Sequence, residues 1–307
     1  MPYNCVVCAK QVPDTKRVTA DAMTEEGTVN RSALPAIFNP EDLNALEAAL
    51  AIRDAHGGTV TVVTMGPPNA SQILRESLYR GADRGILLTD RRSAGSDTLA
   101  TSYILSCAVR KLQPDIVLCG RQAIDGDTAQ VGPQIAEKVG LNLVTYLDRL
   151  DSLEESAIHC RRNVGNGWEE VSCELPVLLT VTDGANTPRP RAAKRLMKHK
   201  KAKTKAEVEK MAENLLQGDY EDYTAELKAN EVEKHCERLG KRGLLLEQWN
   251  LDDIDADPSW CGLSGSPTKV HRIQSVVLTG GQYKEYPPTD EGIAELIGEL
   301  VEEHTLG

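Results

Sequence analysis

The first 140 residues repeat one pattern, in which short apolar runs typical of strands alternate with segments of helical periodicity. The strand-like runs lie at residues 3–9, 59–65, 85–88 and 115–119. Such alternation predicts right-handed crossovers and a parallel sheet that is covered by helices on both faces. Ligands of these sheets bind outside the carboxyl ends of the strands. The sequence therefore predicts an α/β fold with a ligand site at that edge.

The composition restricts the class of protein further. The chain of 307 residues has a net charge of −11, which argues against general nucleic-acid binding but leaves room for a local basic patch. Only 4% of the residues are aromatic, so we expect a core of Val, Leu, Ile and Ala. No apolar run approaches the ~20 residues of a membrane span, and the first residues lack the basic start of a signal peptide. We expect a cytoplasmic protein without a membrane span.

The eight cysteines are expected to be thiols, because the cytoplasm is reducing. Cys5 and Cys8 have the spacing of a metal or redox pair. They lie within a predicted strand, however, where they would face opposite sides of the sheet, so a structural role is favoured. No metal site or Ser-His-Asp arrangement stands out, and no catalytic residue of this kind is expected.

The clearest indication of a ligand site is the loop at 119–133, between a strand-like run and a helix-like stretch at 134–139. This position places free backbone N–H groups and the positive end of a helix dipole where a phosphate binds. Gly120 and Gly126 are expected to let the backbone approach a ligand without a Cβ in the way. Because the loop has two acids and a single Arg, a phosphate here is expected to be bound mainly by the main chain.

One helix start is marked especially clearly. Asn39 is expected to cap the helix, Pro40 to take its first position, and Glu41 and Asp42 to lie in its first turn. Two glycines at 57–58 are expected to end this helix.

After residue 140 the pattern changes. Residues 143–150, 157–163 and 168–173 are predicted to be antiparallel strands, with a turn at 165–167, and residues 175–181 to be another buried strand. The basic run at 188–201 is either a solvated connector or a docking loop for an acidic partner or cofactor. Residues 205–249 are charged and helix-prone, with breaks near Gly218 and Gly240, and are expected to lie on another surface. The apolar stripe at 293–301 is expected either to contact another chain or to pack within its own chain.

Several segments, in this order and at this spacing, resemble the beta subunit of electron transfer flavoproteins. They lie at 6–15, 38–40, 63–68, 81–83, 97–102, 120–133 and 265–270. The resemblance covers about 1–203 and 259–307, whereas 204–258 look longer than is usual. It implies a parallel-sheet nucleotide-binding domain of the adenine-nucleotide alpha-hydrolase-like type at 1–203, with an antiparallel extension and a docking loop at about 184–203. A charged helical insertion at 204–258 and a C-terminal arm at 259–307, which contacts the alpha subunit, would follow.

The resemblance also implies a function within a heterodimer whose alpha subunit carries one FAD. In simpler members the beta subunit holds AMP and has no redox role. In bifurcating members it holds a second FAD, which takes hydride from NADH and sends one electron to ferredoxin or flavodoxin and the other to the alpha-subunit FAD. The sequences DGDTAQVGP at 125–133 and DTLAT at 97–101 are similar to the bifurcating forms. We therefore expect FAD, with AMP as the alternative, and a dehydrogenase or quinone-linked redox partner.

The resemblance further implies which residues surround the nucleotide. Cys8, Asn39 and Met65 would lie around the adenosine. Arg121 would neutralise a phosphate, tune a flavin or form an exposed salt bridge, and Thr98 and Thr101 would either bond the ligand or cap their helix. The expected cofactor-binding residues are Cys8, Asn39, Met65, Asp97, Thr98, Thr101, Gly120, Arg121, Gln122, Ala123, Ile124, Asp125, Gly126, Asp127, Thr128, Ala129, Gln130 and Val131, with the N–H groups of Thr128, Ala129 and Gln130 on the phosphates.

Two observations keep other functions open. The same fold serves ATP-using ligases and nucleotide-binding stress proteins, so a nucleotide sensor without a redox role is a further alternative. The ligases need a Ser-Gly-Gly-type loop after the first strand, where this chain has Lys-Gln-Val-Pro at 10–13, and no Walker or dinucleotide motif occurs. In addition, the bulky apolar anchor that the family presents to acyl-CoA dehydrogenases is replaced at about Ala193. A different redox partner is therefore expected.

Overall fold

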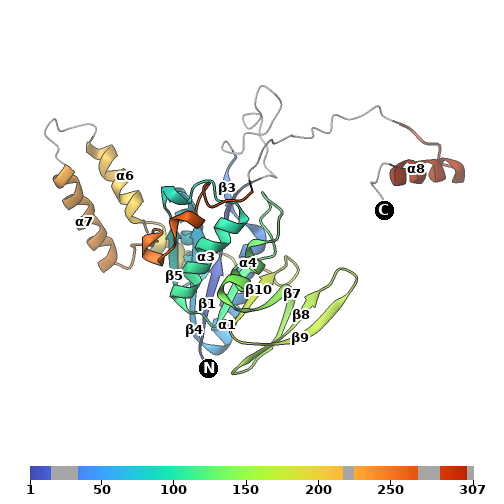
Figure 1. The fold of residues 1–307 in the computed structure, drawn as a ribbon, viewed down its shortest axis with the longest axis horizontal. Coiled ribbons are helices and arrows are strands. Elements are labelled where there is room, and N and C mark those ends of the chain that lie inside the picture. Colours follow the sequence, from blue (N-terminus) through green and yellow to red (C-terminus); the bar gives the residue numbers. More distant parts are fainter. Residues whose placement is uncertain (15–33, 217–224, 269–283, 303–307) are drawn as a thin grey trace.

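The computed structural model describes residues 1–14, 34–216, 225–268 and 284–302. Within these ranges, one sheet has the strand order β11-β5-β4-β1-β6-β10-β7-β8-β9 (Figure 1). Its strands are β1 (Tyr3–Cys8), β4 (Gly58–Met65), β5 (Arg84–Leu88), β6 (Ile116–Gly120), β7 (Asn142–Leu153), β8 (Ala157–Asn163), β9 (Trp168–Glu174), β10 (Val177–Val181) and β11 (Glu247–Trp249). All neighbouring strands from β11 to β7 pair in parallel. The predicted α/β class with a mostly parallel sheet is confirmed. A separate antiparallel pair joins β2 (Gln11–Pro13) to β3 (Ala36–Phe38).

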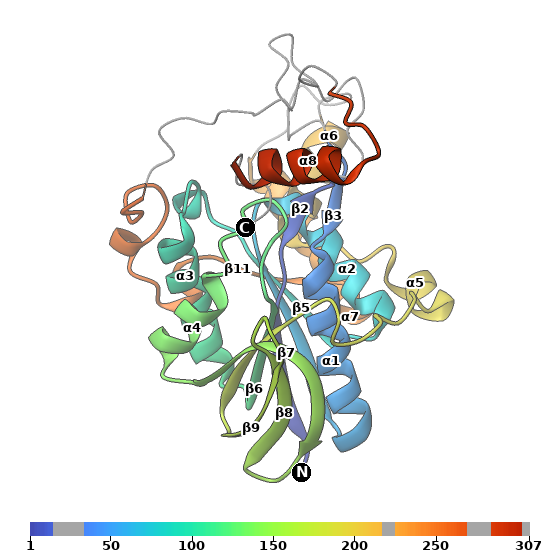
Figure 2. The same ribbon diagram turned by 90° about the vertical axis from the view of Figure 1, so that its right-hand side faces the viewer.

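Helices cover both faces of the parallel part of the sheet. Figure 2 shows α1 (Pro40–His56) and α2 (Ser71–Arg80) on one side, and α3 (Thr98–Leu112) and α4 (Val131–Val139) on the other. Leu46 and Leu50 of α1 pack in the same core cluster as Cys5, whereas Ile104 of α3 packs in the cluster that contains Cys8. Cys5 and Cys8 thus face opposite sides, as predicted. All eight cysteines lie in the described ranges and are free thiols.

The start of α1 follows the sequence signals in all respects but one. The helix begins at Pro40, has Glu41 and Asp42 in its first turn, and ends at Gly57, whose φ is 81°. Asn39 occupies the capping position, but its side chain forms no capping hydrogen bond. The prediction that Asn39 caps the helix through its side chain is therefore wrong, because that side chain bonds another segment, described below.

The strand β7 differs from the prediction for residues 143–150. It pairs antiparallel with β8 along one edge, but its other edge pairs in parallel with β10. The parallel sheet therefore continues through β10 and β7 before the antiparallel hairpin of β8 and β9 extends it. A bulge interrupts the β10–β7 register, and there Tyr146 has a φ of 58°. A bulge allows one strand to bend while it serves both kinds of partner.

The segment after residue 204 belongs partly to the core of this chain. It contains α6 (Lys205–Leu216) and α7 (Ala225–Lys241), and α7 ends close to the break expected near Gly240. The break expected near Gly218 lies outside the described residues. Contrary to the helical prediction up to residue 249, β11 adds an edge strand to the sheet beside β5. Val208, Val232 and Leu239 are buried in the main core cluster, so the surface on which part of this segment packs belongs to its own chain.

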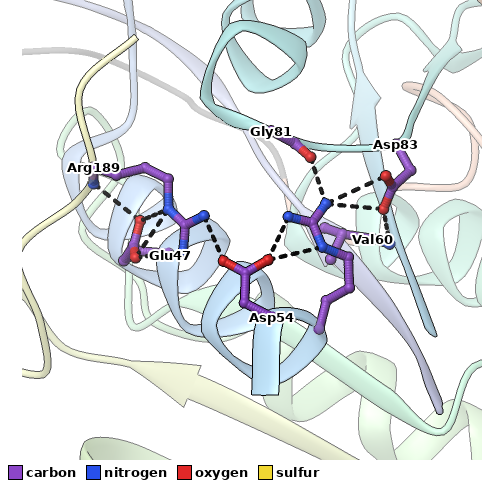
Figure 3. A network of polar contacts seen from close by, with 7 residues as sticks. Glu47, Asp54, Val60, Gly81, Asp83 and Arg189 are labelled. Atoms are coloured by element: carbon purple, nitrogen blue, oxygen red, sulfur yellow. Dashed lines mark hydrogen bonds and ion pairs between the residues drawn. The ribbon is translucent and has the colours of Figure 1, made fainter. Parts of the chain in front are cut away.

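The basic run is attached to the domain by ion pairs at its start. Figure 3 shows Arg189 bound to Glu47 and Asp54 of α1. Asp54 also forms an ion pair with Arg53. The Arg189 Nε–Glu47 Oε2 distance is 2.8 Å. Beyond this attachment, α5 (Ala193–His199) is a short helix without a buried residue. The run is thus attached at Arg189 and exposed at α5, and both predictions for it, a solvated connector and a docking loop, stay open.

The described part of the C-terminal arm ends in α8 (Asp290–Glu302). Its apolar side chains Ile293, Ile297 and Val301 are each about half exposed, and Figure 1 draws the helix apart from the sheet. Residues 269–283 and 303–307 of the expected arm lie outside the described ranges. Among the described helices, none is long and apolar enough to cross a membrane.

Candidate functional site

A cavity of about 540 Å³ opens at the carboxyl edge of the parallel sheet, which is where the sequence predicted a ligand site. This volume lies in the range of roughly 300–1,000 Å³ that is typical of small-molecule sites. Its wall consists of Cys8, Ala9, Lys10, Asp42, Met65, Ser96, Asp97, Thr98, Thr101, Leu105, Cys119, Gly120, Arg121, Gln122, Ala123, Asp125, Gly126, Asp127, Thr128, Ala129, Gln130, Val131, Gly132 and Ile135.

The structure brings almost all of the predicted cofactor-binding residues together around this cavity. Cys8 and Met65 come from the ends of β1 and β4, Asp97 lies at the start of α3, and residues 120–131 form the loop between β6 and α4. Asn39 and Ile124 are the two members of the predicted set that do not line it.

Asn39 supports the loop from behind instead of facing the cavity. It is fully buried, its Nδ2 donates to the carbonyl of Gln122 at 2.8 Å, and its Oδ1 accepts from the N–H of Ile124 at 3.1 Å. The amide side chain thus bonds one carbonyl and one N–H of the loop backbone, so both of its own buried polar ends have partners. Asn39 is a residue that holds the shape of the loop.

The far end of the loop forms a cradle of backbone N–H groups. Asp127 and Ala129 have positive φ values of 49° and 52°, a conformation that costs a non-glycine residue about 1–2 kcal/mol. Within the described part of the chain, the N–H groups of Thr128, Ala129 and Gln130 donate to no acceptor. Left-handed backbone conformations that alternate with right-handed ones turn successive N–H groups toward one point and make an anion-binding concavity. Helix α4 begins directly afterwards at Val131 and adds its positive dipole end.

The first turn of α3 faces the same cavity. Asp97 is the N-cap, and its carboxylate accepts from the N–H of Ala100 at 2.9 Å. Asp97, and not Thr98 or Thr101, therefore caps this helix. Thr98 instead donates through Oγ1 to Oε1 of Gln130 at 3.1 Å, so a side-chain hydrogen bond links the start of α3 to the N–H cradle.

Both cations in the cavity wall are paired with acids. Nη2 of Arg121 lies 2.8 Å from Oε1 of Glu41, whose side chain is only 8% exposed, and its guanidinium carbon lies 5.8 Å from the centre of the Tyr146 ring. Lys10 lies 2.7 Å from Asp125. The salt-bridge interpretation of Arg121 is thus right, although its partner is buried rather than exposed. The Nε of Arg121 is buried and has no hydrogen-bond partner in the described residues.

Asp42 and Lys10 are two wall residues that the sequence analysis did not include. The Asp42 carboxylate accepts from the N–H of Lys10 at 2.8 Å and of Gly120 at 2.9 Å, and so joins the ends of β1 and β6. Burial raises the pKa of Asp42 to about 7, although both N–H groups favour its ionised form. Lys10 follows the first strand closely, and this position indicates a place at the carboxyl edge of the sheet. Asp42 has the sequence position of an ordinary first-turn acid, which gives no indication of the cavity.

The glycines of the loop serve packing more than ligand approach. A Cβ at Gly120 would lie 2.5 Å from Oδ1 of Asp42, and one at Gly132 would lie 2.7 Å from Sγ of Cys119. A Cβ at Gly126 would meet nothing within 4 Å. The expected reason for Gly120 therefore needs correction, because the group that approaches its backbone closely is α1 and not a ligand.

The two thiols in the cavity wall are unreactive. Burial raises the pKa of Cys8 to about 12 and that of Cys119 well above its ordinary value. Because the thiolate is the nucleophile and the metal ligand, these cysteines contribute shape and not chemistry.

Comparison with known proteins identifies a family for this chain. Residues 26–215 match the family model described as the electron transfer flavoprotein domain. The electron transfer flavoprotein subunit beta of Clostridium acetobutylicum is 39% identical over 99% of this chain and 100% of its own length. The caffeyl-CoA reductase-Etf complex subunit CarD of Acetobacterium woodii is 39% identical over 98% of this chain and 99% of its own length. Protein FixA of Azorhizobium caulinodans is 40% identical over 95% of this chain and 92% of its own length.

The fold and the cavity define an α/β protein with a small-molecule-sized cavity at the carboxyl edge of its parallel sheet. The shared identity extends over almost the whole of each of these relatives. The chain belongs to the beta subunits of electron transfer flavoproteins.

Proposed function

We propose that this chain pairs with an alpha subunit in the cytoplasm and holds a second FAD in its cavity, as the beta subunit of an electron-bifurcating flavoprotein. Bound there, the flavin would take hydride from NADH and pass one electron to ferredoxin or flavodoxin and the other to the FAD of the alpha subunit. The observation that carries the proposal is the set of unbonded N–H groups at Thr128, Ala129 and Gln130 beside the start of α4.

The residues present fit a dinucleotide. The N–H cradle suits a diphosphate, and the hydroxyls of Thr98 and Thr101 extend the polar wall toward α3. On the other side, Arg121 lines the cavity, and Glu41 and the Tyr146 ring fix its guanidinium. Main-chain donors therefore bind the phosphates, and Arg121 holds a positive group in a fixed place, as the protein around a redox cofactor must.

Two surfaces support the proposed partners. The half-exposed apolar residues Ile293, Ile297 and Val301 of α8 form a stripe suited to the alpha subunit. On α5, Met197 is 63% exposed and is flanked by Lys194 and Lys198, which suits an acidic redox protein. This docking surface replaces the apolar anchor that is missing at Ala193.

The test is the nucleotide content of the purified heterodimer. We expect mass spectrometry of the released nucleotides to give two FAD per heterodimer and no AMP. One FAD with one AMP would identify a non-bifurcating subunit, because the same N–H cradle suits a single phosphate. A complex without flavin colour would instead indicate a nucleotide sensor.

A second measurement tests the site itself. Ala129→Pro fixes φ near −65° and so destroys the left-handed conformation at this position, which should empty the cavity. The matched control is Ala129→Gly, which keeps the positive φ at the same position and should retain the nucleotide. Retention of the full nucleotide content by Ala129→Pro would contradict the proposed site.

A further inference from the structure

The segment at 256–268, which we name the α3 clamp, packs across the loop before α3. The N–H of Gly262 donates to Oγ of Ser96 at 3.0 Å, and the N–H of Leu263 donates to the carbonyl of Ala94 at 3.1 Å. Gly262 has a φ of 62°, and a Cβ there would lie 2.1 Å from the carbonyl oxygen of Arg92. Only glycine allows this approach, so the contact is a specific one between segments more than 160 residues apart.

The clamp ends on the residue that caps α3. Oδ2 of Asp97 accepts from the N–H of Thr268 at 3.0 Å and from its hydroxyl at 2.6 Å. The N–H of Asp97 donates to the hydroxyl of Ser266 at 2.8 Å, and Ser266 is itself buried and bonded to the carbonyl of Gly262 at 2.7 Å. Since the other oxygen of the same carboxylate caps α3 at Ala100, one side chain holds both the clamp and the helix start.

Hydrogen bonds on both sides of the first turn of α3 connect the clamp to the cavity wall. From Thr268 this connection passes through Asp97 to the first turn of α3, where Thr98 bonds the side chain of Gln130. Gln130 contributes one of the unbonded N–H groups of the cradle. Neither Ser266 nor Thr268 lines the cavity, so their effect on a ligand must be indirect, and both residues bond Asp97, which does line it.

We propose that Ser266 and Thr268 are positioning residues for the nucleotide site, and that the clamp couples nucleotide affinity to the anchoring of the C-terminal segment. The clamp fixes Asp97, Asp97 fixes the first turn of α3, and Thr98 aligns Gln130 and the cradle. By linkage, a nucleotide that binds the aligned cradle more tightly also strengthens the hold of Asp97 on Thr268. The inference rests on the proposed function only in that a nucleotide occupies the cavity; it is the same for FAD and for AMP.

The test compares Thr268→Val with Thr268→Ser in the full chain with its alpha subunit, after removal of the bound nucleotide. Valine keeps the shape and the backbone N–H but loses the hydroxyl, whereas serine keeps the hydroxyl. We expect Thr268→Val to weaken binding of added FAD, or of AMP if that is the ligand released, by about tenfold, and Thr268→Ser to restore it. The control is Thr59→Val, which loses a comparable exposed hydroxyl bond to Asn4, 2.8 Å long and remote from the cavity wall.

Amide hydrogen exchange supplies a readout that loss of general stability would not imitate. Addition of nucleotide to the unsubstituted complex should slow exchange at the Thr268 amide, and this protection should be lost in Thr98→Val, which breaks the connection at Gln130. Unchanged affinity in Thr268→Val, or exchange at Thr268 that does not respond to nucleotide, would overturn the inference. If the unsubstituted complex binds neither FAD nor AMP, the proposed function fails instead.

Discussion

Replacement of Asp42 by Asn tests whether burial or hydrogen bonding controls the carboxyl group beneath the cavity loop. Asp42 accepts the N–H groups of Lys10 and Gly120, one on each oxygen. Asparagine keeps one acceptor and turns an amide N–H₂ toward the other donor. One buried N–H is then unsatisfied, which costs about 1–3 kcal/mol, so Asp42→Asn should be less stable than the unsubstituted chain in urea unfolding at pH 5.

The pH dependence of this difference carries the sharper prediction. Burial raises the folded-state pKa of Asp42 from 3.8 to about 7, so between these values the folded state holds more protons than the unfolded state. Stability contributed by Asp42 must then fall as the pH rises through this window. From pH 5 to pH 8 the loss amounts to about 2–3 kcal/mol. Asparagine does not titrate. The free energy of unfolding of the unsubstituted protein, measured relative to that of Asp42→Asn, should therefore fall by that amount between pH 5 and pH 8.

The measurement is urea unfolding of both proteins at pH 5, 6, 7 and 8, with equal m-values as the check that the unfolding transition is the same. A difference that stays constant, or grows with pH, would refute the reasoning. It would mean that the N–H groups of Lys10 and Gly120 keep Asp42 ionised throughout and outweigh its burial. Glu47→Gln is a suitable control, because Glu47 lies on the same helix but outside the cavity wall.

Three further predictions concern the packing of the loop glycines, the backbone strain at Ala129 and the anchoring of the basic run at 188–201. Gly132→Ala should lower the free energy of unfolding by about 1–3 kcal/mol, because its Cβ would lie 2.7 Å from Sγ of Cys119; Gly126→Ala, with open space, should not, and equal losses in urea unfolding would contradict this. Ala129→Gly should raise that free energy by up to about 1 kcal/mol, since glycine adopts positive φ without strain; a loss of stability would count against strain at this position. Arg189→Met should cost about 1 kcal/mol and speed amide exchange at 188–192, and unchanged exchange there would show that its ion pairs do not anchor the run.

Local sequence pattern was sufficient for the elements whose signals are local. The strand β8 has the predicted bounds of 157–163, and α1 begins at the predicted Pro40. The position of the cavity followed from the alternation alone, because parallel strands end at a common edge. Helix starts, turns and alternation of apolar residues are all read within a few residues of chain.

The features that sequence pattern missed depend on partners distant in the chain. Asn39 resembles a helix cap, yet its side chain bonds Gln122 and Ile124 more than 80 residues away. The strand β11 has only three residues, too few for a periodic signal, and forms because β5 offers it an unpaired edge. Asp42 has the ordinary place of a first-turn acid, and only the fold brings Gly120 onto its carboxylate. In each case tertiary contact decides between two locally acceptable roles.

The charges around the cavity bear on how this acidic chain would hold the phosphate of the proposed nucleotide. Four aspartates line the cavity, at 42, 97, 125 and 127, against two cations, Lys10 and Arg121, which are already paired. Side-chain charge alone would therefore repel an anion. Three of these acids are restrained, however: Asp125 by Lys10, Asp97 by the α3 cap and the clamp, and Asp42 by a pKa raised by burial to about 7. The groups that remain to attract a phosphate are oriented backbone N–H dipoles and a helix terminus, which do not titrate. Affinity for phosphate should consequently depend on the backbone conformation at 127–130 far more than on any single cation, and loss of Lys10 should weaken binding less than loss of the left-handed conformation at Ala129.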